Sequence, residues 1–369
     1  MLPFADTFWS LPGLWFALIV VLWAGYFVLE GFDFGVGMLL PVVGRDDAER
    51  RAVLSTIGPV WDGNEVWLIV AGGATFAAFP EWYATLFSGF YLALFLILLG
   101  LIVRGVAIEY RGKLKEARWR ARWDRAIVFG SALPAFLWGV AFADIIHGVP
   151  IGRDGEFTGG LLDLLHPYAL LGGLVSLCLF AFHGAVFLTL RTHGETRLRA
   201  RRLALALAVP ALATLAAFLA WSALDSGSVG TKWTISALLL ALVTLLIGAA
   251  VLLARRDRDG WAFAATALAI VVAATTLFID LYPRVLVSST SSDFSLNVFA
   301  ASSSHYTLVV MTIVALVCTP IVLLYQSWSY WVFRARLGRE EFGEGRNPLD
   351  AVAGTWLGKK SGIGKRPTG

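Results

Sequence analysis

Nine long apolar stretches follow one another along this chain, and each is about as long as a membrane-crossing helix. Roughly 20 apolar residues in a helix span the hydrocarbon core of a bilayer. Hydrophobic residues make up 58% of the sequence and charged residues 15%, a balance that excludes a soluble globular domain. We therefore predict an all-α membrane protein, a polytopic bundle of nine transmembrane helices arranged as two four-helix groups plus one. The stretches lie near residues 13–38, 57–79, 82–105, 124–147, 166–190, 203–224, 233–254, 260–282 and 305–333.

Basic residues lie almost entirely on one side of these stretches. The segments after the first, third, fifth and seventh stretches, together with the tail, hold 26 of the 30 Lys and Arg residues. The other side holds three, Arg153, Lys232 and Arg284, and Arg104 lies within a stretch. Because loops rich in Lys and Arg stay in the cytoplasm, the N-terminus is predicted to lie outside and the C-terminus inside. This asymmetry requires an odd number of spans.

The chain divides at the end of the ninth stretch. Residues 1–333 form the predicted transmembrane domain, and residues 334–369 form a polar, loosely ordered cytoplasmic tail. We expect no secretory signal, because residues 2–9 carry no basic residue. Residues 44–52 are predicted to be a charged loop, the pair at 58–59 the first turn of the second helix, and residues 109–125 an amphipathic surface segment.

Acidic residues inside two of the stretches are the strongest indication of function. A carboxylate at the bilayer centre costs roughly 2.5 to 3.5 kcal/mol on insertion scales. Glu30 and Asp33 lie near the inner end of the first stretch, and Asp62 and Glu65 near the inner start of the second. Each pair has the spacing i and i+3, which places both members on one helix face. Two neighbouring antiparallel helices would bring the four carboxylates to one depth, which Arg104 of the third stretch also reaches.

This predicted cluster has two interpretations. Carboxyl groups held together away from water can take up and release protons near neutral pH, which suits a proton path. Alternatively, the acids and Arg104 form a structural network that joins the helices. The adjacent Trp61 and Trp67 likewise either border a route for a quinone or a gas, or simply pack.

The histidines give little support to haem binding by this chain. Of the five, His183 alone lies well inside an apolar stretch, whereas a haem with two axial histidines needs a facing pair at similar depth. We therefore predict that the chain ligates no haem and no other metal ion, and that His183 hydrogen-bonds to a neighbouring helix.

Several motifs together resemble subunit II of the cytochrome bd quinol oxidases. The longest are EGFDFGVGML at residues 30–39 and WDGNEVWL at residues 61–68, both unusual for membrane helices. The resemblance extends over nearly the whole chain, to about residue 331, through shorter matches at residues 71–80, 87–91, 118–124, 139–150, 283–296 and 320–328.

The resemblance implies one subunit of an oxidase in the bacterial cytoplasmic (inner) membrane that oxidises quinol, reduces O2 to water and generates a proton motive force. In that family subunit I binds two haems b and one haem d, and subunit II carries no catalytic residue of its own. The motif match places Asp62 in the proton path, together with Glu30 and Asp33. Glu65 and Arg104 are predicted to belong to the same proton path because they lie at the same depth as these acids.

The same resemblance implies an oxygen route beside Trp67. Some family members bind a quinone in subunit II, for which Trp61 is a candidate contact. The expected partners are the haem-bearing subunit I, quinol, O2 and membrane lipids, with room for small accessory subunits and no nucleic acid. Two other functions fit an acid cluster in a membrane bundle: a proton-coupled secondary transporter and a purely structural subunit. Co-purification with a haem-bearing partner separates the oxidase subunit from the transporter.

Overall fold

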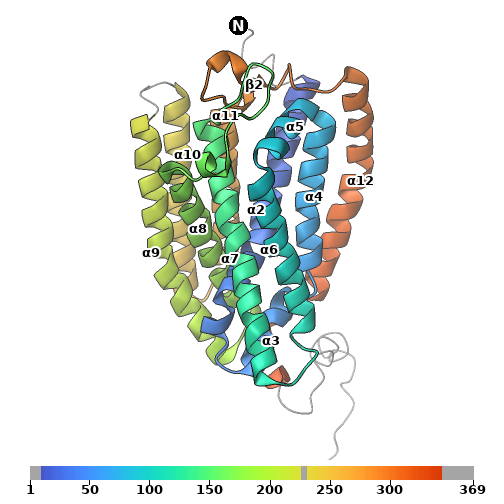
Figure 1. The fold of residues 1–369 in the computed structure, drawn as a ribbon. Coiled ribbons are helices and arrows are strands. Elements are labelled where there is room, and N and C mark those ends of the chain that lie inside the picture. The colour runs from blue at the N-terminus through green and yellow to red at the C-terminus, as the bar shows by residue number, and fades with distance from the viewer. Residues whose placement is uncertain (1–9, 226–230, 343–369) are drawn as a thin grey trace, which may run out of the picture.

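A computed structural model describes residues 10–225 and 231–342, and most of these residues lie in long helices that form one bundle (Figure 1). Within this described part, eight helices are long and apolar enough to cross a membrane. The all-α membrane class predicted from the sequence is therefore confirmed. The eight are α2 (Leu11–Val43), α6 (Tyr91–Tyr110), α7 (Ala117–His147), α8 (Pro167–Arg191), α9 (Gly194–Asp225), α10 (Thr231–Arg255), α11 (Asp259–Leu281) and α12 (His305–Val332).

The second predicted stretch forms α4 (Trp61–Ala78), which is not among those eight. Its length of 18 residues is sufficient, but Asp62, Asn64 and Glu65 make its first turns polar. The nine predicted stretches thus correspond to the eight apolar helices and α4.

Three segments differ from the sequence-based expectation. Residues 44–52 are not a loop, because α3 (Asp47–Ile57) begins there and the Asp46 side chain accepts the Glu49 N–H at 2.9 Å. The pair at 58–59 lies in the turn between α3 and α4, rather than in the first turn of the second helix. The third stretch is also divided, into α5 (Pro80–Gly89) and α6. Gly89 closes α5 where the Phe157 ring of the outer loop occupies the space of a side chain.

Helix α2 is the centre of the bundle and packs against α4, α7, α8 and α11. Its glycines allow this, since a Cβ on Gly35 would overlap the backbone of α8 at Gly184. A Cβ on Gly31 would meet the Phe180 ring, and one on Gly37 would meet Ser131 of α7. The close helix approach predicted from these small residues is confirmed. Residues of α2 between these glycines are consequently sealed from lipid.

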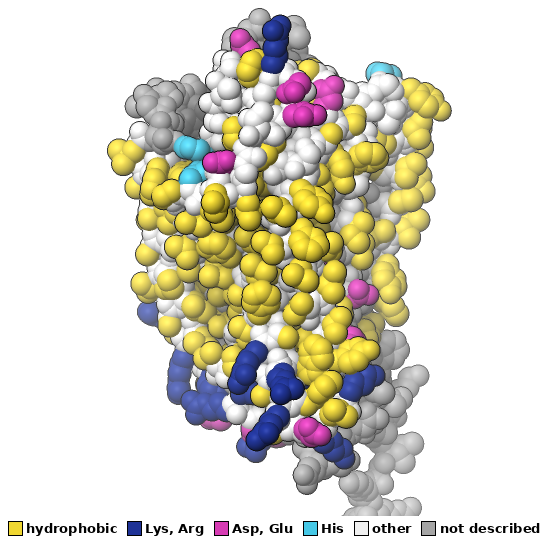
Figure 2. Space-filling model, in the orientation of Figure 1, with side chains coloured by type: hydrophobic (Ala, Val, Ile, Leu, Met, Phe, Trp, Pro, Cys, Tyr) yellow, Lys and Arg dark blue, Asp and Glu magenta, His cyan; other side chains and the backbone are white. Residues whose placement is uncertain are grey.

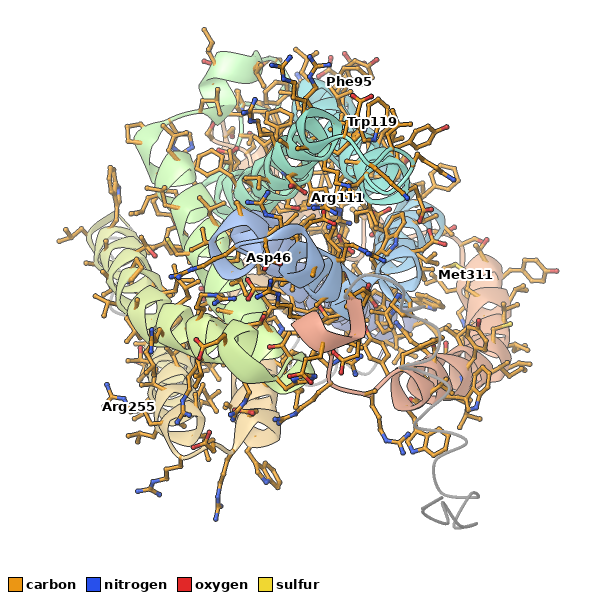
Figure 3. All side chains as sticks on the ribbon, turned by 90° about the horizontal axis from the view of Figure 1, so that it is seen from below. Asp46, Phe95, Arg111, Trp119, Arg255 and Met311 are labelled. Carbon is orange, nitrogen blue, oxygen red and sulfur yellow. The ribbon has the colours of Figure 1, made fainter. Side chains whose placement is uncertain are left out.

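Helices α8, α9, α10 and α11 pack in a ring, while α6 packs on α7. Helix α12 stands at the margin of the bundle (Figures 1 and 3). Leu308 is its single buried residue, and side chains such as Ile313, Leu316 and Tyr325 are exposed. The structure therefore leaves one long apolar helix largely uncovered by its own chain.

The two ends of the bundle differ in secondary structure and in charge. At one end, which we call the outer end after the orientation predicted from the sequence, lie η1 (Leu161–Leu164), η2 (Ser292–Phe294) and an antiparallel pair of short strands, β1 (Arg284–Leu286) and β2 (Leu296–Asn297). The other end, which we call the basic end, carries α3 and the α6–α7 and α8–α9 turns. Lys and Arg side chains gather there below an apolar belt (Figure 2). The segregation of charge seen in the sequence is therefore present in three dimensions.

The start of the tail is ordered, contrary to expectation. Residues 334–342, which end in η3 (Arg339–Phe342), cross the basic end as a strap. The Leu337 N–H donates to the Arg191 carbonyl at 2.9 Å, and Leu337 and Phe342 are buried against Ala52 of α3. The rest of the predicted tail, residues 343–369, lies outside the described residues.

Candidate functional site

Helices α2, α4 and α6 bring four charged side chains together inside the bundle. Glu30 and Asp33 of α2 and Arg104 of α6 are fully buried, and the side chain of Glu65 of α4 is 23% exposed. Arg104 forms ion pairs with both Glu30 and Glu65. We call these four residues the acid cluster. The structure thus brings together four of the five residues predicted for the proton path.

Close packing of α6 on α7 directs Arg104 into this interior. A Cβ on Gly130 of α7 would meet the Gly100 carbonyl and the backbone of Arg104, so the two helices touch at this level. The guanidinium lies over the Phe34 ring, with its carbon 4.8 Å from the ring centroid. A planar guanidinium can pair with two carboxylates at once, which an ammonium group does poorly. Arg104 therefore joins α2 and α4 through one side chain.

Asp33 is held by a different set of contacts, which the sequence did not predict. The Asn64 side-chain amide donates to Asp33 Oδ2 at 2.7 Å. Asn64 Oδ1 in turn accepts from Gln326 Nε2 at 3.3 Å and from the Tyr330 hydroxyl at 2.7 Å. Trp67 Nε1 donates to Gln326 Oε1 at 3.0 Å. A hydrogen-bonded chain thus leads from α12 to Asp33.

The cluster has the composition of a proton-exchange site. One guanidinium cannot neutralise three carboxylates, and a net charge inside the membrane is costly. Among the described residues, Asp33 Oδ1 has no hydrogen-bond partner. Oδ1 of Asp33 can therefore bind a proton without breaking the contact between Asp33 Oδ2 and Asn64.

Asp62 does not join this cluster. It lies in the first turn of α4, its side chain is exposed, and within the described part of the chain no ion pair or side-chain hydrogen bond involves it. Three of the four carboxylates of the predicted cluster therefore lie together in this structure, and Asp62 stands apart from them at the surface. Glu65 reaches inward to Arg104, whereas Asp62 sits at the open N-terminal end of the helix, where free backbone N–H groups favour an anion.

The two tryptophans of α4 pack against neighbouring helices. The Trp61 ring covers Gly105 of α6, where an added Cβ would lie 3.3 Å from it. The Trp67 ring packs against Gly25 of α2, and its N–H is bound by Gln326. These contacts favour the packing interpretation for Trp61 and place Trp67 where α2, α4 and α12 meet.

His183 is hydrogen-bonded between helices, as predicted. Its Nε2 lies 3.1 Å from the Val28 carbonyl of α2, and its Nδ1 lies 2.7 Å from Thr266 Oγ1 of α11. A carbonyl can only accept, so Nε2 carries the proton and Nδ1 is engaged by the hydroxyl. Both ring nitrogens are used, and His183 therefore does not fit as an axial ligand for haem iron.

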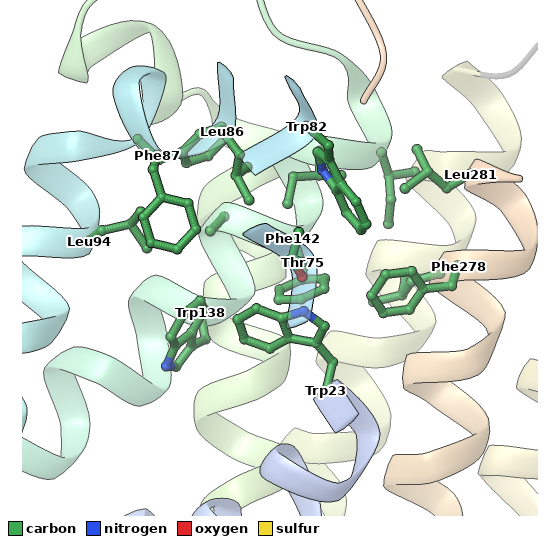
Figure 4. A pocket seen from close by; sticks show the side chains of 15 residues that line it. Trp23, Thr75, Trp82, Leu86, Phe87, Leu94, Trp138, Phe142, Phe278 and Leu281 are labelled. Carbon is green, nitrogen blue, oxygen red and sulfur yellow. The ribbon is translucent and has the colours of Figure 1, made fainter. Parts of the chain in front are cut away.

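Two cavities among the described helices bear on these predictions. A cavity of about 640 Å³ opens between α7, α8, α9, α10 and α11. Its walls are mainly apolar, and Tyr168, Ser222, Ser236, Asp280 and Arg284 line its outer end. The other, of about 30 Å³, lies among Trp23, Trp138, Phe142, Phe278 and their neighbours (Figure 4). Neither Trp61 nor Trp67 lines either cavity.

Comparisons with known proteins agree over almost the full length. Residues 11–333 match the family described as cytochrome bd terminal oxidase subunit II. The chain is 42% identical to cytochrome bd ubiquinol oxidase subunit 2 of Bacillus subtilis, covering 90% of this chain and 98% of that protein. It is 39% identical to cytochrome bd-I ubiquinol oxidase subunit 2 of Escherichia coli K12, covering 91% and 97% respectively.

A solved structure has a similar fold. A chain of the bd oxidase from Geobacillus thermodenitrificans superimposes with a TM-score of 0.69 at 17% sequence identity, covering 88% of this chain and 99% of that chain. At so low an identity the similarity concerns the arrangement of helices alone.

Proposed function

The chain belongs to the family of cytochrome bd terminal oxidase subunit II, and from this we propose that its acid cluster carries protons from the basic end of the bundle toward the oxygen-reducing site of the complex. The chain is a multi-pass membrane subunit of a bd-type oxidase, a haem-containing oxidoreductase complex that oxidises quinol. Family membership therefore favours the oxidase subunit over the proton-coupled transporter. The alternative is that the cluster is only a structural network, and experiment has to distinguish it from a proton path.

We place the protein in the bacterial cytoplasmic membrane with the basic end in the cytoplasm. Nine helices then cross the bilayer, because α4, at ~1.5 Å per residue, is about 27 Å long and close to the hydrocarbon thickness. Residues 1–333 make the transmembrane domain and residues 334–369 the cytoplasmic tail. The distribution of basic residues supports this orientation.

The partner in this proposal is subunit I, which holds the two haems b and the haem d. His183 of this chain is already engaged on both ring nitrogens. His166 accepts the Ala169 N–H and pairs with Asp144 at 2.9 Å. Haem supplies the electron transfer and oxygen chemistry when bound by the partner, and the residues of this chain act on protons.

The observation that carries the proton path is the burial of the acid cluster. Water formation consumes protons in the interior of the complex, and carboxyl groups in line within a membrane are the usual way to deliver them. Glu65, Arg104 and Glu30 are in direct contact. Asp62 lies one helical turn from Glu65, at the surface of this chain. We propose that Asp62 and Asp33 extend the path on either side of this contact.

Substitution of the acids tests the path. Asp33→Asn, Glu30→Gln and Asp62→Asn remove a proton site while keeping the side-chain shape. Each should slow quinol-driven O2 consumption and proton uptake by proteoliposomes at least tenfold, with haem content unchanged. Glu81→Gln, at an exposed position of α5 at the outer end, is the matched control and should behave as wild type. Wild-type proton uptake in all three variants would leave the cluster a structural network.

We further propose that Trp67 borders a route for O2, because it is partly exposed where three helices meet. Trp67→Ala should change the KM for O2 more than the maximal rate. An equal KM in variant and wild type would reject this role.

A quinone bound to this subunit would fit the cavity of about 640 Å³, which is in the size range of small-molecule sites. The apolar walls suit an isoprenoid tail. Arg284, Tyr168 and Ser222 at the outer end offer donors to quinone carbonyls. Trp61 is too far from this cavity to line it, so the quinone contact suggested for Trp61 is not proposed. Quinone analysis of purified complex should find one more quinone per complex in wild type than in a variant with Ala143→Trp, which fills the cavity.

A further inference from the structure

Helix α12 is attached to its own bundle by a small number of polar contacts. Near its outer end the Trp15 indole N–H lies 3.2 Å from the Leu308 carbonyl and 3.1 Å from Thr312 Oγ1. Near its inner end the contacts are those of Gln326 and Tyr330 with α4. Most other side chains of α12 are exposed. The inner contacts therefore act on α4 at the turn that carries Asn64.

The orientation of the Asn64 amide follows from these contacts. Its oxygen accepts two hydrogen bonds, from Gln326 Nε2 and the Tyr330 hydroxyl, and both of those groups belong to α12. The Trp67 indole N–H can only donate, so Gln326 turns its Oε1 to Trp67 and its Nε2, which also only donates, to Asn64. The Asn64 oxygen therefore faces α12. The NH2 group then points to Asp33, to which it donates at 2.7 Å. Asn64 is fully buried, and water cannot replace these partners.

We propose that Gln326 and Tyr330 are positioning residues that orient the Asn64 amide toward Asp33. The position of α12 against α4 then determines how tightly Asp33 holds a proton. The inference rests on the proposed function of Asp33 in the proton path. It deepens that function by adding a control element from a helix that contributes no acid of its own.

The physical basis is the difference between the two ends of a side-chain amide, since the NH2 group donates hydrogen bonds and the oxygen accepts them. An NH2 group donating to a carboxylate stabilises the ionised form, by an amount typical of hydrogen bonds to charged groups. If α12 moves away, the Asn64 oxygen loses both donors and the amide is free to turn. A carbonyl oxygen facing Asp33 instead repels the carboxylate and accepts from the protonated acid. Movement of α12 would thus switch Asp33 from releasing its proton to retaining it.

Other charged groups act on the same site and have to be kept constant in a test. Glu30, Glu65 and Arg104 act electrostatically on Asp33 from α2, α4 and α6. Arg191 of α8 acts on the Tyr330 hydroxyl. A useful substitution therefore removes the α12 donors and leaves every ionisable group of α2, α4, α6 and α8 in place.

Tyr330→Phe and Gln326→Leu meet this requirement. In the purified holo-oxidase, the pH at which proton uptake is half-maximal should rise in each variant. It should rise by about one unit when the two changes are combined, because the Asn64 amide can then turn and its hydrogen bond to the carboxylate is lost. Tyr330→Phe keeps the ring and its packing, so it carries the test if Gln326→Leu fails to assemble. The infrared C=O band of protonated Asp33, identified by its absence in Asp33→Asn, should shift in Tyr330→Phe as well. Ser327→Ala, on the exposed side of the same turn, is the control and should leave the pH profile and the band unchanged.

Two results would overturn the inference. One is a wild-type pH profile in both α12 variants, with or without a lower melting temperature, because that pattern belongs to a purely structural contact. The other is an equal shift in Ser327→Ala. Asp33→Asn separates this failure from that of the proposed function: if proton uptake is normal in Asp33→Asn, the place of Asp33 in the path is rejected. If it is slow there and the α12 variants behave as wild type, the positioning role alone is rejected.

Discussion

Arg104 is the residue on which the buried charges depend most directly. It is fully buried, its guanidinium contacts both Glu30 and Glu65, and within the described residues its Nε and Nη1 atoms have no hydrogen-bond partner. Removing one partner of a buried ion pair leaves an uncompensated charge, which typically costs about 3–5 kcal/mol. Arg104 is therefore expected to be needed for assembly as well as for proton transfer.

A double-mutant cycle on Arg104 and Glu30 tests this expectation. Arg104→Gln alone should destabilise the complex by about 3–5 kcal/mol, because two carboxylates lose their cation. Arg104→Gln combined with Glu30→Gln should be milder than the sum of the single changes, since the second substitution removes one of the unpaired charges. Thermal unfolding of the purified complex measures the effect. Strictly additive changes would show that the two side chains do not interact.

At this scale the charged residues of the site could be predicted and the neutral ones could not. Glu30, Asp33 and Glu65 stand out in an apolar sequence because burying a carboxylate is costly. Burying the neutral amides of Asn64 and Gln326 costs much less, so these residues do not stand out in the sequence. The sequence also does not show that α12 lies beside α4. The exposure of Asp62 could not be predicted for a related reason: helical spacing fixes the direction of a side chain on its helix, but not which side of the helix is covered.

At the scale of elements, the strap formed by residues 334–342 joins helices that are distant in the sequence. Arg336 pairs with Asp259 of α11 at 3.0 Å, and Arg339 with Asp46 beside α3 at 3.2 Å. Glu341 accepts from the Gly338 N–H at 2.8 Å and lies 3.0 Å from His193 Nε2, between α8 and α9. The strap thus ties the end of α12 to three other parts of the basic end.

The docking of the strap should depend on pH through Glu341. Burial alone would raise the pKa of Glu341, but hydrogen bonds from His193 and the Gly338 N–H outweigh it, and the pKa lies below its ordinary value. A carboxyl group whose pKa is lowered by folding stabilises the folded form above its ordinary pKa. This contribution is lost as the pH falls from about 4.5 through the lowered value. The protection factors for hydrogen exchange at residues 337–341, which are corrected for the intrinsic pH dependence of exchange, should therefore be steady near neutral pH and fall in acid.

Glu341→Gln is the control for this prediction. It should loosen the strap already at neutral pH and remove the part of the acid response that belongs to Glu341, while the ion pairs of Arg336 and Arg339 stay. Equal hydrogen exchange in wild type and Glu341→Gln at every pH would show that Glu341 does not hold the strap.

The ends of a helix could be predicted where they follow from the length of an apolar stretch. They could not be predicted where they depend on contacts with other parts of the chain. Helices α8, α10 and α11 begin and end within a few residues of the predicted limits, because the change from apolar to charged sequence marks both ends. Helix α3 was missed because its charged residues look like a loop until their partners are known: Asp47, for example, pairs with Arg111 and Arg120 across the basic end. Figure 3 shows α3 lying below the bundle with Arg111 nearby.

For the whole molecule, the exposed side of α4 is distinct from the other apolar surfaces. Ile69 and Phe76 of α4 are exposed, as are Leu98 of α6 and Leu316 of α12. Asp62 is exposed on the same helix as the first two. Lipid chains cannot solvate a carboxylate, so this side of the bundle has to be covered by protein or water. Family membership supplies a covering protein, subunit I of the oxidase. We therefore expect the partner to lie on α4 and its neighbours, where Asp62 would become part of the interface.

A bulky substitution on this surface distinguishes a protein partner from lipid. Ile69 of α4 is 72% exposed and Leu245 of α10 is 69% exposed in the isolated chain. Extra volume in a packed interface typically costs about 1–3 kcal/mol, whereas fluid lipid adapts to it. Ile69→Trp should therefore reduce the amount of haem recovered with the tagged chain at least fivefold, and Leu245→Trp should leave it unchanged. If both variants retain full haem, the partner does not cover α4, and the exposed position of Asp62 needs an aqueous path instead. If Leu245→Trp alone loses haem, the partner lies on the α10 side of the bundle.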